Sequence, residues 1–262
     1  METKENKTLQ KIYFASDFHL GIPDYESSLK REKLLVSWLD SVRKDAAEIF
    51  LMGDIFDFWF EYKTVVPKGY VRLLGKLAEI TEAGIPVHLF TGNHDIWAFE
   101  YLNKEVNIQL HTHPEIIKLM GKTFYLAHGD GLGPGDKGYK FLKKVFSSRF
   151  NQFLFRWLHP DVGARMGLYF SGKSRLANMV KENKKENLNR IEDEMLYKYV
   201  SDLLNNGLEA DYFVFGHRHR PVDIELKQGS HMIILGDWLT NFTYAEFDGK
   251  NLNLKYFKKE ML

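Results

Sequence analysis

The chain has 262 residues, a net charge of +1 and 44% hydrophobic residues, so it can bury one large core with an inserted segment, and an overall disordered chain is excluded. It contains no cysteine, which excludes disulfides and thiolate metal sites. Residues 2–10 are polar and no long apolar run is visible, so we expect neither a secretory signal nor a membrane span, and a cytoplasmic location.

Five short apolar segments have the aromatic and branched composition of β-strands. They are residues 11–16, 48–52, 85–91, 122–127 and 212–215. Four of them are apolar almost throughout, which is typical of strands buried on both faces. Amphipathic helices are expected at residues 27–43 and 68–82. The predicted fold is an α/β layered sandwich of two central β-sheets flanked by helices.

A polar motif closes each of these apolar segments. The motifs are Asp17-Phe18-His19, Gly53-Asp54, Gly92-Asn93-His94-Asp95, His128-Gly129-Asp130 and Gly216-His217-Arg218-His219. Ligands of open α/β sheets bind at the carboxyl ends of the strands, so we expect the five loops to converge. Because alternate residues of an extended strand share a face, Asp17 and His19 should point together while Phe18 enters the core.

The residue types in these motifs favour a metal centre. A single buried His is more often a hydrogen-bonded core residue than a metal ligand, so one motif alone means little. Five motifs in order, each at a strand end, reverse that balance. Carboxylate, imidazole and amide groups together suit a pair of divalent transition ions. The set predicts metal-assisted phosphoester hydrolysis.

From residue 11 to residue 238 the ordered motifs resemble the calcineurin-like metallophosphoesterase superfamily. The resemblance implies two divalent ions, with Mn²⁺ as our expectation, although such mixed sites also accept Fe²⁺, Co²⁺ and Zn²⁺. It implies that one ion is held by Asp17, His19 and His219. The other ion would be held by Asn93, His128 and His217, and Asp54 would bridge the two. Surplus positive charge at such a site can hold phosphate oxygens and activate a water.

Two further residues follow the proposed ligand Asn93. The resemblance implies that His94 lies over the phosphate, as a charge stabiliser or as a proton donor to the leaving oxygen; the alternative is a His that packs its loop. We expect Asp95 to orient a neighbouring imidazole. Asp130 could do the same for its own loop.

Residues 137–190 carry thirteen Lys and Arg against three Asp and Glu, a net charge of +10, which leaves −9 for the rest of the chain. Aromatic residues at helical spacing between the basic ones predict a basic amphipathic helix or helix pair near 139–158. Further helices are expected from residue 162 and over 186–205. We predict a helical cap at residues 136–205, inserted into a core of residues 1–135 and 206–262.

Three interpretations of this basic, aromatic cap remain open from composition alone. It could be an ordinary helical subdomain with solvated lysines. It could bind nucleic acid, which needs basic charge and exposed aromatic platforms. It could instead be a lid that meets a membrane surface or takes up acyl chains.

Within the superfamily the chain resembles the bacterial UDP-2,3-diacylglucosamine diphosphatases of lipid A biosynthesis. After the His128 motif, Asp136 and Tyr139 match positions that imply a uridine contact and a wall of the site. A basic and serine cluster is similar to groups that contact the diphosphate and glucosamine; it comprises Ser171, Lys173, Ser174 and Arg175. The resemblance also implies substrate contacts from Asn93, His94 and His217.

The activity implied by this resemblance is attack of activated water on the α-phosphorus of UDP-2,3-diacylglucosamine, giving UMP and 2,3-diacylglucosamine 1-phosphate. Acyl chains would lie along the aromatic face of the cap, whose basic face would meet anionic lipids. The enzyme would then be peripheral on the cytoplasmic face of the inner membrane, with no nucleic acid and no obligate protein partner.

One position departs from that family, which has Arg where this chain has His94. A sugar phosphate, whose second pKa is about 6, leaves readily without a proton, whereas His could also serve an alkoxide leaving group. A nucleotide pyrophosphatase or phosphodiesterase with a soluble substrate therefore stays open. So does a non-enzymatic scaffold, although a scaffold would be expected to lose ligands and this chain keeps all seven.

Overall fold

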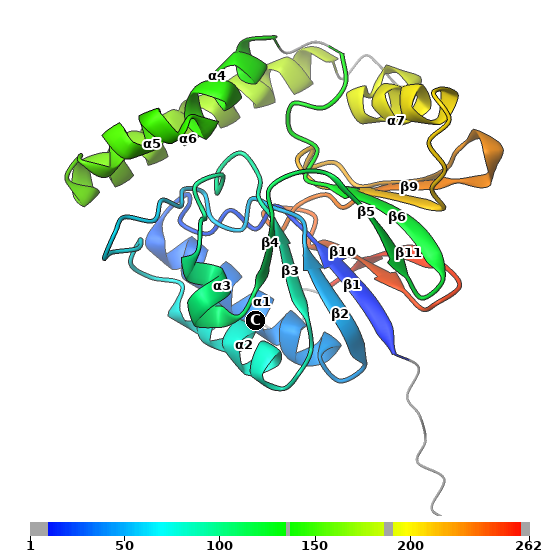
Figure 1. The fold of residues 1–262 in the computed structure, drawn as a ribbon, viewed down its shortest axis with the longest axis horizontal. Helices are drawn as coiled ribbons and strands as arrows, with labels where there is room; N and C mark the ends of the chain where they lie inside the picture. Colours follow the sequence, from blue (N-terminus) through cyan, green and yellow to red (C-terminus); the bar gives the residue numbers. More distant parts are fainter. Residues whose placement is uncertain (1–9, 135–136, 186–190, 258–262) are drawn as a thin grey trace, which may run out of the picture.

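The computed structural model describes residues 10–134, 137–185 and 191–257. Two β-sheets pack face to face, helices cover their outer faces, and three further helices lie over one end of the sandwich (Figure 1). The predicted α/β sandwich is confirmed.

The first sheet has six strands in the order β11-β10-β1-β2-β3-β4. Their bounds are β1 (Lys11–Ala15), β2 (Ala46–Leu51), β3 (Val87–Phe90), β4 (Gln109–His111), β10 (Thr243–Phe247) and β11 (Leu252–Tyr256). Strands β1 to β4 are parallel. Strand β10 pairs antiparallel with β1, and β11 pairs antiparallel with β10. The outer face is covered by α1 (Tyr25–Val42), α2 (Val71–Glu82) and α3 (Tyr101–Val106).

The second sheet has five strands in the order β5-β6-β7-β9-β8. Their bounds are β5 (Glu115–Leu119), β6 (Lys122–Ala127), β7 (Tyr212–Phe215), β8 (Val222–Glu225) and β9 (His231–Ile234). The three central strands are parallel, and β5 and β8 are antiparallel edges. Helix α7 (Met195–Asn205), after the short turn η1 (Ile191–Asp193), buries Leu196 and Val200 against this sheet. A second short turn is η2 (Lys227–Gly229).

Aromatic and aliphatic side chains from both sheets fill the space between them. Phe14 and Phe50 of the first sheet stack on each other, and Phe14 also stacks on Phe124 of the second, with ring centroids 5.7 Å apart. Burying each such side chain contributes about 1.5–3 kcal/mol. Both faces of the central strands are buried in this way, which explains why their sequences are apolar almost throughout. The five predicted strands are all present, with ends within two residues of the expectation.

Three helices lie over the carboxyl ends of the first sheet's strands (Figure 1). We call them the cap helices; they are α4 (Lys137–Ser147), α5 (Arg149–Arg156) and α6 (Pro160–Lys185). The predicted basic helix pair and the helix after it are confirmed. Residues 186–190, where another helix was expected to begin, lie outside the described residues, and the helix that follows begins at Met195.

Candidate metal centre

The loops that carry the predicted motifs converge at the carboxyl ends of the strands. The main chain there is left-handed rather than extended, with φ of 57° at Asp17, 53° at Asp54 and 67° at His217. Each such non-glycine residue stores strain of about 1–3 kcal/mol, which persists only where the surroundings fix it. Phe18 is buried as expected, but the predicted reason, strand alternation, is wrong, because Asp17 and His19 both have positive φ.

Asp17, His19 and His219 form the first cluster of candidate ligands, with one ligand atom of each within 4.8 Å of the others. His19 Nε2 is 3.6 Å from Asp17 Oδ1 and 3.3 Å from His219 Nε2. His219 Nε2 is also 3.6 Å from Asp17 Oδ1. The remaining oxygen, Asp17 Oδ2, accepts a hydrogen bond from the His217 backbone N–H, so Oδ1 is the oxygen turned toward the imidazoles.

Asp54, His128 and His217 form the second cluster. Asp54 lies between the two clusters, since its Oδ2 is 3.3 Å from His128 Nε2 and 3.8 Å from His19 Nε2. Its Oδ1 accepts a hydrogen bond of 2.9 Å from the His94 backbone N–H. One carboxylate oxygen therefore faces both clusters, which is the arrangement that a bridging ligand needs.

Three buried atoms at the centre have no hydrogen-bond partner among the described residues: Asp17 Oδ1, Asn93 Oδ1 and His128 Nε2. Leaving such polar atoms unpaired costs about 1–3 kcal/mol each. All three can donate an electron pair to a cation. Together with the two clusters they fit a divalent metal centre, and the clusters support divalent-metal binding.

Two hydrogen bonds and one ion-pair contact on the far sides of the imidazoles indicate which nitrogen faces the centre. His128 Nδ1 donates to the Met52 carbonyl over 2.7 Å, and Nε2 is thereby left as the electron-pair donor. His219 Nδ1 is 3.2 Å from Asp237 Oδ2, and His19 Nδ1 is 3.3 Å from Asp57 Oδ1. Carboxylate partners of this kind orient metal-binding imidazoles and strengthen them as ligands.

Sequence reasoning assigned no role to Asp57, Asp237 or Arg31. Asp57 lies three residues after Asp54, and Asp237 lies in a Gly-Asp-Trp segment. Neither position is a strong sequence signal for a functional role. Arg31 gives no sequence signal, because it lies on the apolar side of α1. There it donates hydrogen bonds to the carbonyls of Phe18 and His19, both over 2.7 Å. These contacts hold the loop of the first motif in place.

The centre strongly favours positive charge. Burial alone would lower the pKa of His128, but the nearby charge of Asp54 raises it to about 10. Burial likewise opposes protonation of His19, yet its contacts with Asp17 and Asp57 raise its pKa to about 10. Burial lowers the pKa of His217 to about 4, so this imidazole is neutral at pH 7 and available as a ligand.

Asp95 does not orient an imidazole, so that prediction is wrong. Its carboxylate accepts from the backbone N–H groups of Gly92 and Ile55, over 2.7 and 2.8 Å. It thus ties the loop of Asn93 to the loop of Asp54. Burial and the nearby charge of Asp54 raise the pKa of Asp95 to about 7.

His94 lies over the centre without belonging to the seven predicted ligands. Its Nε2 is 3.9 Å from Asp54 Oδ2, and its ring meets that of His19 edge-on with centroids 4.8 Å apart. Its Nδ1 is 3.0 Å from both the Asp57 carbonyl and Ser171 Oγ. Burial lowers the pKa of His94.

Two of the predicted cap residues reach the centre. Ser171 of α6 is buried and donates to Asp57 Oδ2 over 2.6 Å. The Tyr139 hydroxyl donates to Asp130, and its ring centroid is 6.5 Å from that of His217. Lys173 is exposed and lies over the Tyr169 ring at 4.8 Å. Asp136 lies outside the described residues, as do the side chains of Ser174 and Arg175.

Helix α6 approaches the core closely through two glycines spaced one turn apart. A Cβ added at Gly167 would stand 2.1 Å from the Phe58 ring, and one at Gly163 would stand 2.1 Å from the Tyr62 hydroxyl. Ser171 continues the same helical face. The cap helices are thus held against the loop after β2 by small residues, next to an aromatic contact between Phe155 and Phe60 with centroids 4.7 Å apart.

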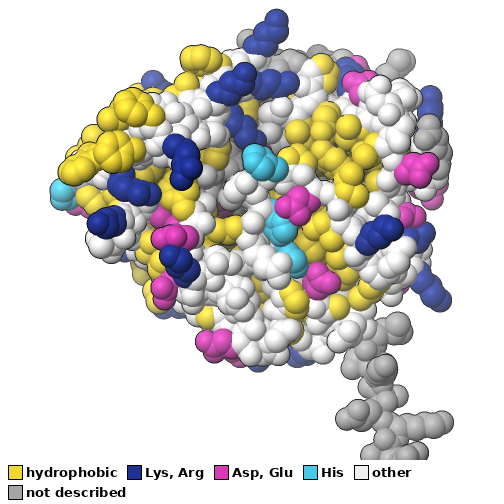
Figure 2. Space-filling view, viewed as in Figure 1, with side chains coloured by type: hydrophobic (Ala, Val, Ile, Leu, Met, Phe, Trp, Pro, Cys, Tyr) yellow, Lys and Arg dark blue, Asp and Glu magenta, His cyan; other side chains and the backbone are white. Residues whose placement is uncertain are grey.

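The outward side of α5 and α6 is apolar and basic. Figure 2 shows hydrophobic side chains interleaved with Lys and Arg over this end of the molecule, at the upper left. Phe150 is 68% exposed and Trp157 is 77% exposed. Exposed apolar groups on this scale mark a surface that meets a membrane, a protein or a ligand. Within the described part of the chain, no helix combines the length and hydrophobicity needed to cross a bilayer.

Known proteins resemble this chain over most of its length. The calcineurin-like phosphoesterase family profile matches residues 10–221. The chain is 38% identical over 254 residues to a UDP-2,3-diacylglucosamine hydrolase of Porphyromonas gingivalis, covering 94% of this chain and 97% of that protein. A Haemophilus influenzae protein of the same name is 27% identical over 237 residues, or 89% and 93% of the two chains. A solved dimetal phosphatase from Danio rerio has a TM-score of 0.47 and 12% identity, over 95% and 96%.

Proposed function

Because the chain belongs to the calcineurin-like phosphoesterase family, we propose that it is a metal-dependent hydrolase that cleaves the pyrophosphate bond of UDP-2,3-diacylglucosamine. Water attacks the α-phosphorus, and the products are UMP and 2,3-diacylglucosamine 1-phosphate. The observation that carries the reaction class is Asp54 Oδ2, which faces His128 and His19 from between two imidazole–carboxylate clusters. The substrate rests on the relatives' names.

We propose that this centre binds two divalent ions, Mn²⁺ in our proposal. Asp17, His19 and His219 would hold one, Asn93, His128 and His217 would hold the other, and Asp54 would bridge them. When bound, the ions supply positive charge that lowers the pKa of water and stabilises the phosphoryl transition state.

The other residues of the site position the substrate. His94 carries a ring nitrogen on the centre side, 3.9 Å from Asp54 Oδ2, and its Nδ1–H is held by the Asp57 carbonyl. We assign it a contact with the phosphate, whose negative charge favours the protonated imidazole, and in that form Nε2–H stabilises the charge. Tyr139 forms a wall beside His217, and Ser171 contacts the substrate from α6. Asp136, Lys173, Ser174 and Arg175 complete the substrate contacts in this proposal.

The cap supplies the selectivity for an acylated sugar. We assign residues 136–205 to the cap and residues 1–135 and 206–262 to the catalytic core; within the cap, α7 packs on the second sheet, so α4 to α6 act as the lid. Acyl chains lie along their aromatic side, while Lys and Arg side chains meet anionic headgroups. The enzyme then works at the cytoplasmic face of the inner membrane.

The test compares three substrates with the Mn²⁺-loaded protein: UDP-2,3-diacylglucosamine, UDP-glucose and p-nitrophenyl phosphate. Release of UMP from the first should be far faster than hydrolysis of the other two. Equal rates on all three would remove the lipid assignment but leave the hydrolase. No turnover of any substrate, with Mn²⁺ bound, would remove the hydrolase as well.

A soluble nucleotide pyrophosphatase or phosphodiesterase is the second candidate, and one observation favours it. In its protonated form the His94 imidazole can give its Nε2 proton to an alkoxide leaving group, which a sugar phosphate does not need. In the same three-substrate assay this candidate predicts that UDP-glucose is hydrolysed as fast as the diacylated sugar.

A further inference from the structure

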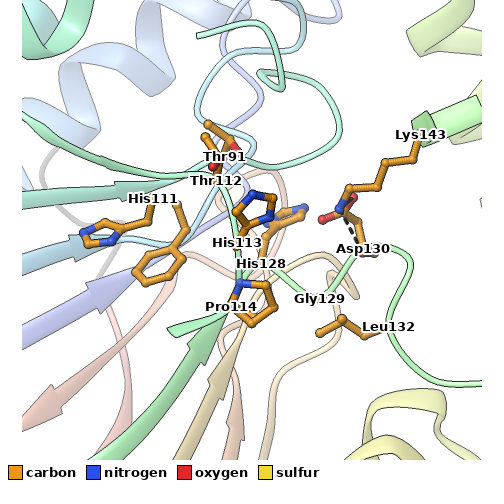
Figure 3. A pocket seen from close by; sticks show the side chains of 12 residues that line it. Thr91, His111, Thr112, His113, Pro114, His128, Gly129, Asp130, Leu132 and Lys143 are labelled. Atoms are coloured by element: carbon orange, nitrogen blue, oxygen red, sulfur yellow. Dashed lines mark hydrogen bonds and ion pairs between the residues drawn. The ribbon is translucent and has the colours of Figure 1, made fainter. Parts of the chain in front are cut away.

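A pocket with both polar and apolar lining opens beside the metal centre, between the segment after β4 and the loop after β6 (Figure 3). Its empty volume is about 290 Å³, part of which is open to solvent. Thr91, Thr112, His113 and Pro114 line it on one side, and Lys143 of α4 reaches it from the cap. The proposed function gives this space no occupant.

The pocket adjoins the half of the centre assigned to the second ion. His128, a proposed ligand of that ion, forms part of its wall. Thr91, also on the wall, stands two residues before the ligand Asn93. A group seated in the pocket could thus belong to the same molecule as a phosphate held at the centre.

The charged side chains on the wall are engaged with each other. Asp130 forms an ion pair of 2.6 Å with Lys143, which is drawn as a dashed line in Figure 3, and it also accepts from Tyr139. His111 is bound to Glu115 over 2.8 Å. The wall therefore offers mainly the hydroxyls of two threonines, an imidazole and ring faces, with little net charge.

Of the parts of a lipid-linked nucleotide, the lining disfavours an acyl chain and a second phosphate, and it fits the nucleoside. An acyl chain would strip water from the hydroxyl and imidazole groups without replacing their hydrogen bonds. A second phosphate would find Lys143 already paired with Asp130. A neutral, flat group with several hydrogen-bonding atoms suits both the polar groups and the ring faces.

Building on the proposed function, we propose that this pocket holds the nucleoside of the substrate, with Thr112 and His113 as its specificity contacts. The exposed aromatic surface that we assign to acyl chains lies on α5 and α6, whereas α4 supplies Lys143. The two ends of the substrate thus meet different walls, and the α-phosphate lies between them at the centre.

The experiment measures inhibition constants for hydrolysis of bis(p-nitrophenyl) phosphate by the full chain with Mn²⁺. The inhibitors are UMP, ribose 5-phosphate and inorganic phosphate. For the unmodified protein, UMP should inhibit at least about tenfold more tightly than phosphate, with ribose 5-phosphate between them. Thr112→Val and His113→Ala should each raise the UMP constant about fivefold, the usual effect of one lost hydrogen bond, and leave the phosphate constant within about twofold.

Two matched variants serve as controls. Thr112→Ser keeps the hydroxyl and should restore tight inhibition by UMP. Lys118→Ala changes an exposed residue of β5 that does not line the pocket, and should leave all three constants unchanged.

The pocket assignment is overturned if Thr112→Val and His113→Ala leave UMP inhibition unchanged, or raise the UMP and phosphate constants in parallel. In that case release of UMP from UDP-2,3-diacylglucosamine by the unmodified protein still supports the proposed function. The opposite outcome is also distinguishable. If the protein does not hydrolyse the diacylated sugar, but UMP inhibits it preferentially and both variants abolish that preference, the nucleoside pocket is supported and the proposed substrate is contradicted.

Discussion

The metal centre and the cap helices differ in how deeply their side chains are buried and in how they are hydrogen-bonded. At the centre, Asp54 and His128 are buried, and their outward atoms are fixed by hydrogen bonds from neighbouring loops. In the cap, neither α4 nor α5 contains a buried residue. The centre, to which we assign the chemistry, is thus more deeply buried than α4 and α5, to which we assign recognition of the acyl chains. Changes in the two regions should therefore have separable effects.

The largest expected effect comes from the centre itself. Asp54→Asn removes the charge that faces both clusters, and it should lower turnover of every phosphoester by at least about 1000-fold, or ~4 kcal/mol of transition-state stabilisation. Turnover of the diacylated sugar and of bis(p-nitrophenyl) phosphate measures this. Glu225→Gln, an exposed carboxylate on β8, is the control. Activity of Asp54→Asn near that of the control would show that Asp54 is not a bridging ligand.

A smaller loss is expected one contact away from the ligands. Asp237→Asn weakens the acceptor of His219 Nδ1, and it should reduce Mn²⁺ affinity by about 10–100-fold. Isothermal titration with Mn²⁺ measures the affinity. Asp211→Asn, which breaks an exposed ion pair with Lys122, is the matched control. If both variants bind Mn²⁺ equally well, Asp237 does not support the centre.

The cap can be displaced without touching the ligands. Gly167→Ala places a methyl group 2.1 Å from the Phe58 ring, so α6 must shift. We expect about tenfold lower kcat/KM on the diacylated sugar, with bis(p-nitrophenyl) phosphate hydrolysis within about threefold. Gly138→Ala adds the same group to α4, where no described atom outside the neighbouring helical backbone lies within 4 Å, and should change neither. Parallel loss on both substrates in Gly167→Ala would contradict the separation of the two regions.

The smallest effect is expected at the outer surface of the cap. Trp157→Ser should weaken binding to anionic phospholipid vesicles about tenfold, because a side chain of this size contributes about 1.5–3 kcal/mol when buried. Sedimentation with vesicles measures this. Tyr25→Ser is a matched control, since Tyr25 of α1 is 75% exposed and Trp157 is 77% exposed. Equal vesicle binding by the two variants would mean that the cap does not meet the membrane.

The sequence predicted most of the fold because each buried strand is a continuous apolar run closed by a polar motif. The same pattern predicted the candidate residues of the centre, since His128 directly follows such a run and Asp54 follows one after a single glycine. The contacts around them were not predictable. Asp57 accepts a hydrogen bond from Ser171, which is 114 positions away in the chain, and no local sequence pattern indicates a contact of that separation.

Backbone conformation was the other limit. Asp17 and His19 have positive φ, which is uncommon for residues with side chains and gives no signal in a hydrophobic pattern. The close approach of Gly167 to Phe58 could not be predicted either. A glycine within a helical sequence can weaken the helix or allow another side chain to pack closely, and the sequence alone does not distinguish the two. Asp95 was misassigned for this reason, as its partners are backbone N–H groups set by the loop geometry.

The most direct measurement is the anomalous diffraction of a crystal grown with Mn²⁺. We predict two manganese peaks on either side of Asp54 Oδ2, one beside Asp17, His19 and His219, and the other beside Asn93, His128 and His217. Manganese elsewhere in the molecule, or no peak beside Asp54, would contradict the dinuclear centre on which the proposed hydrolysis depends.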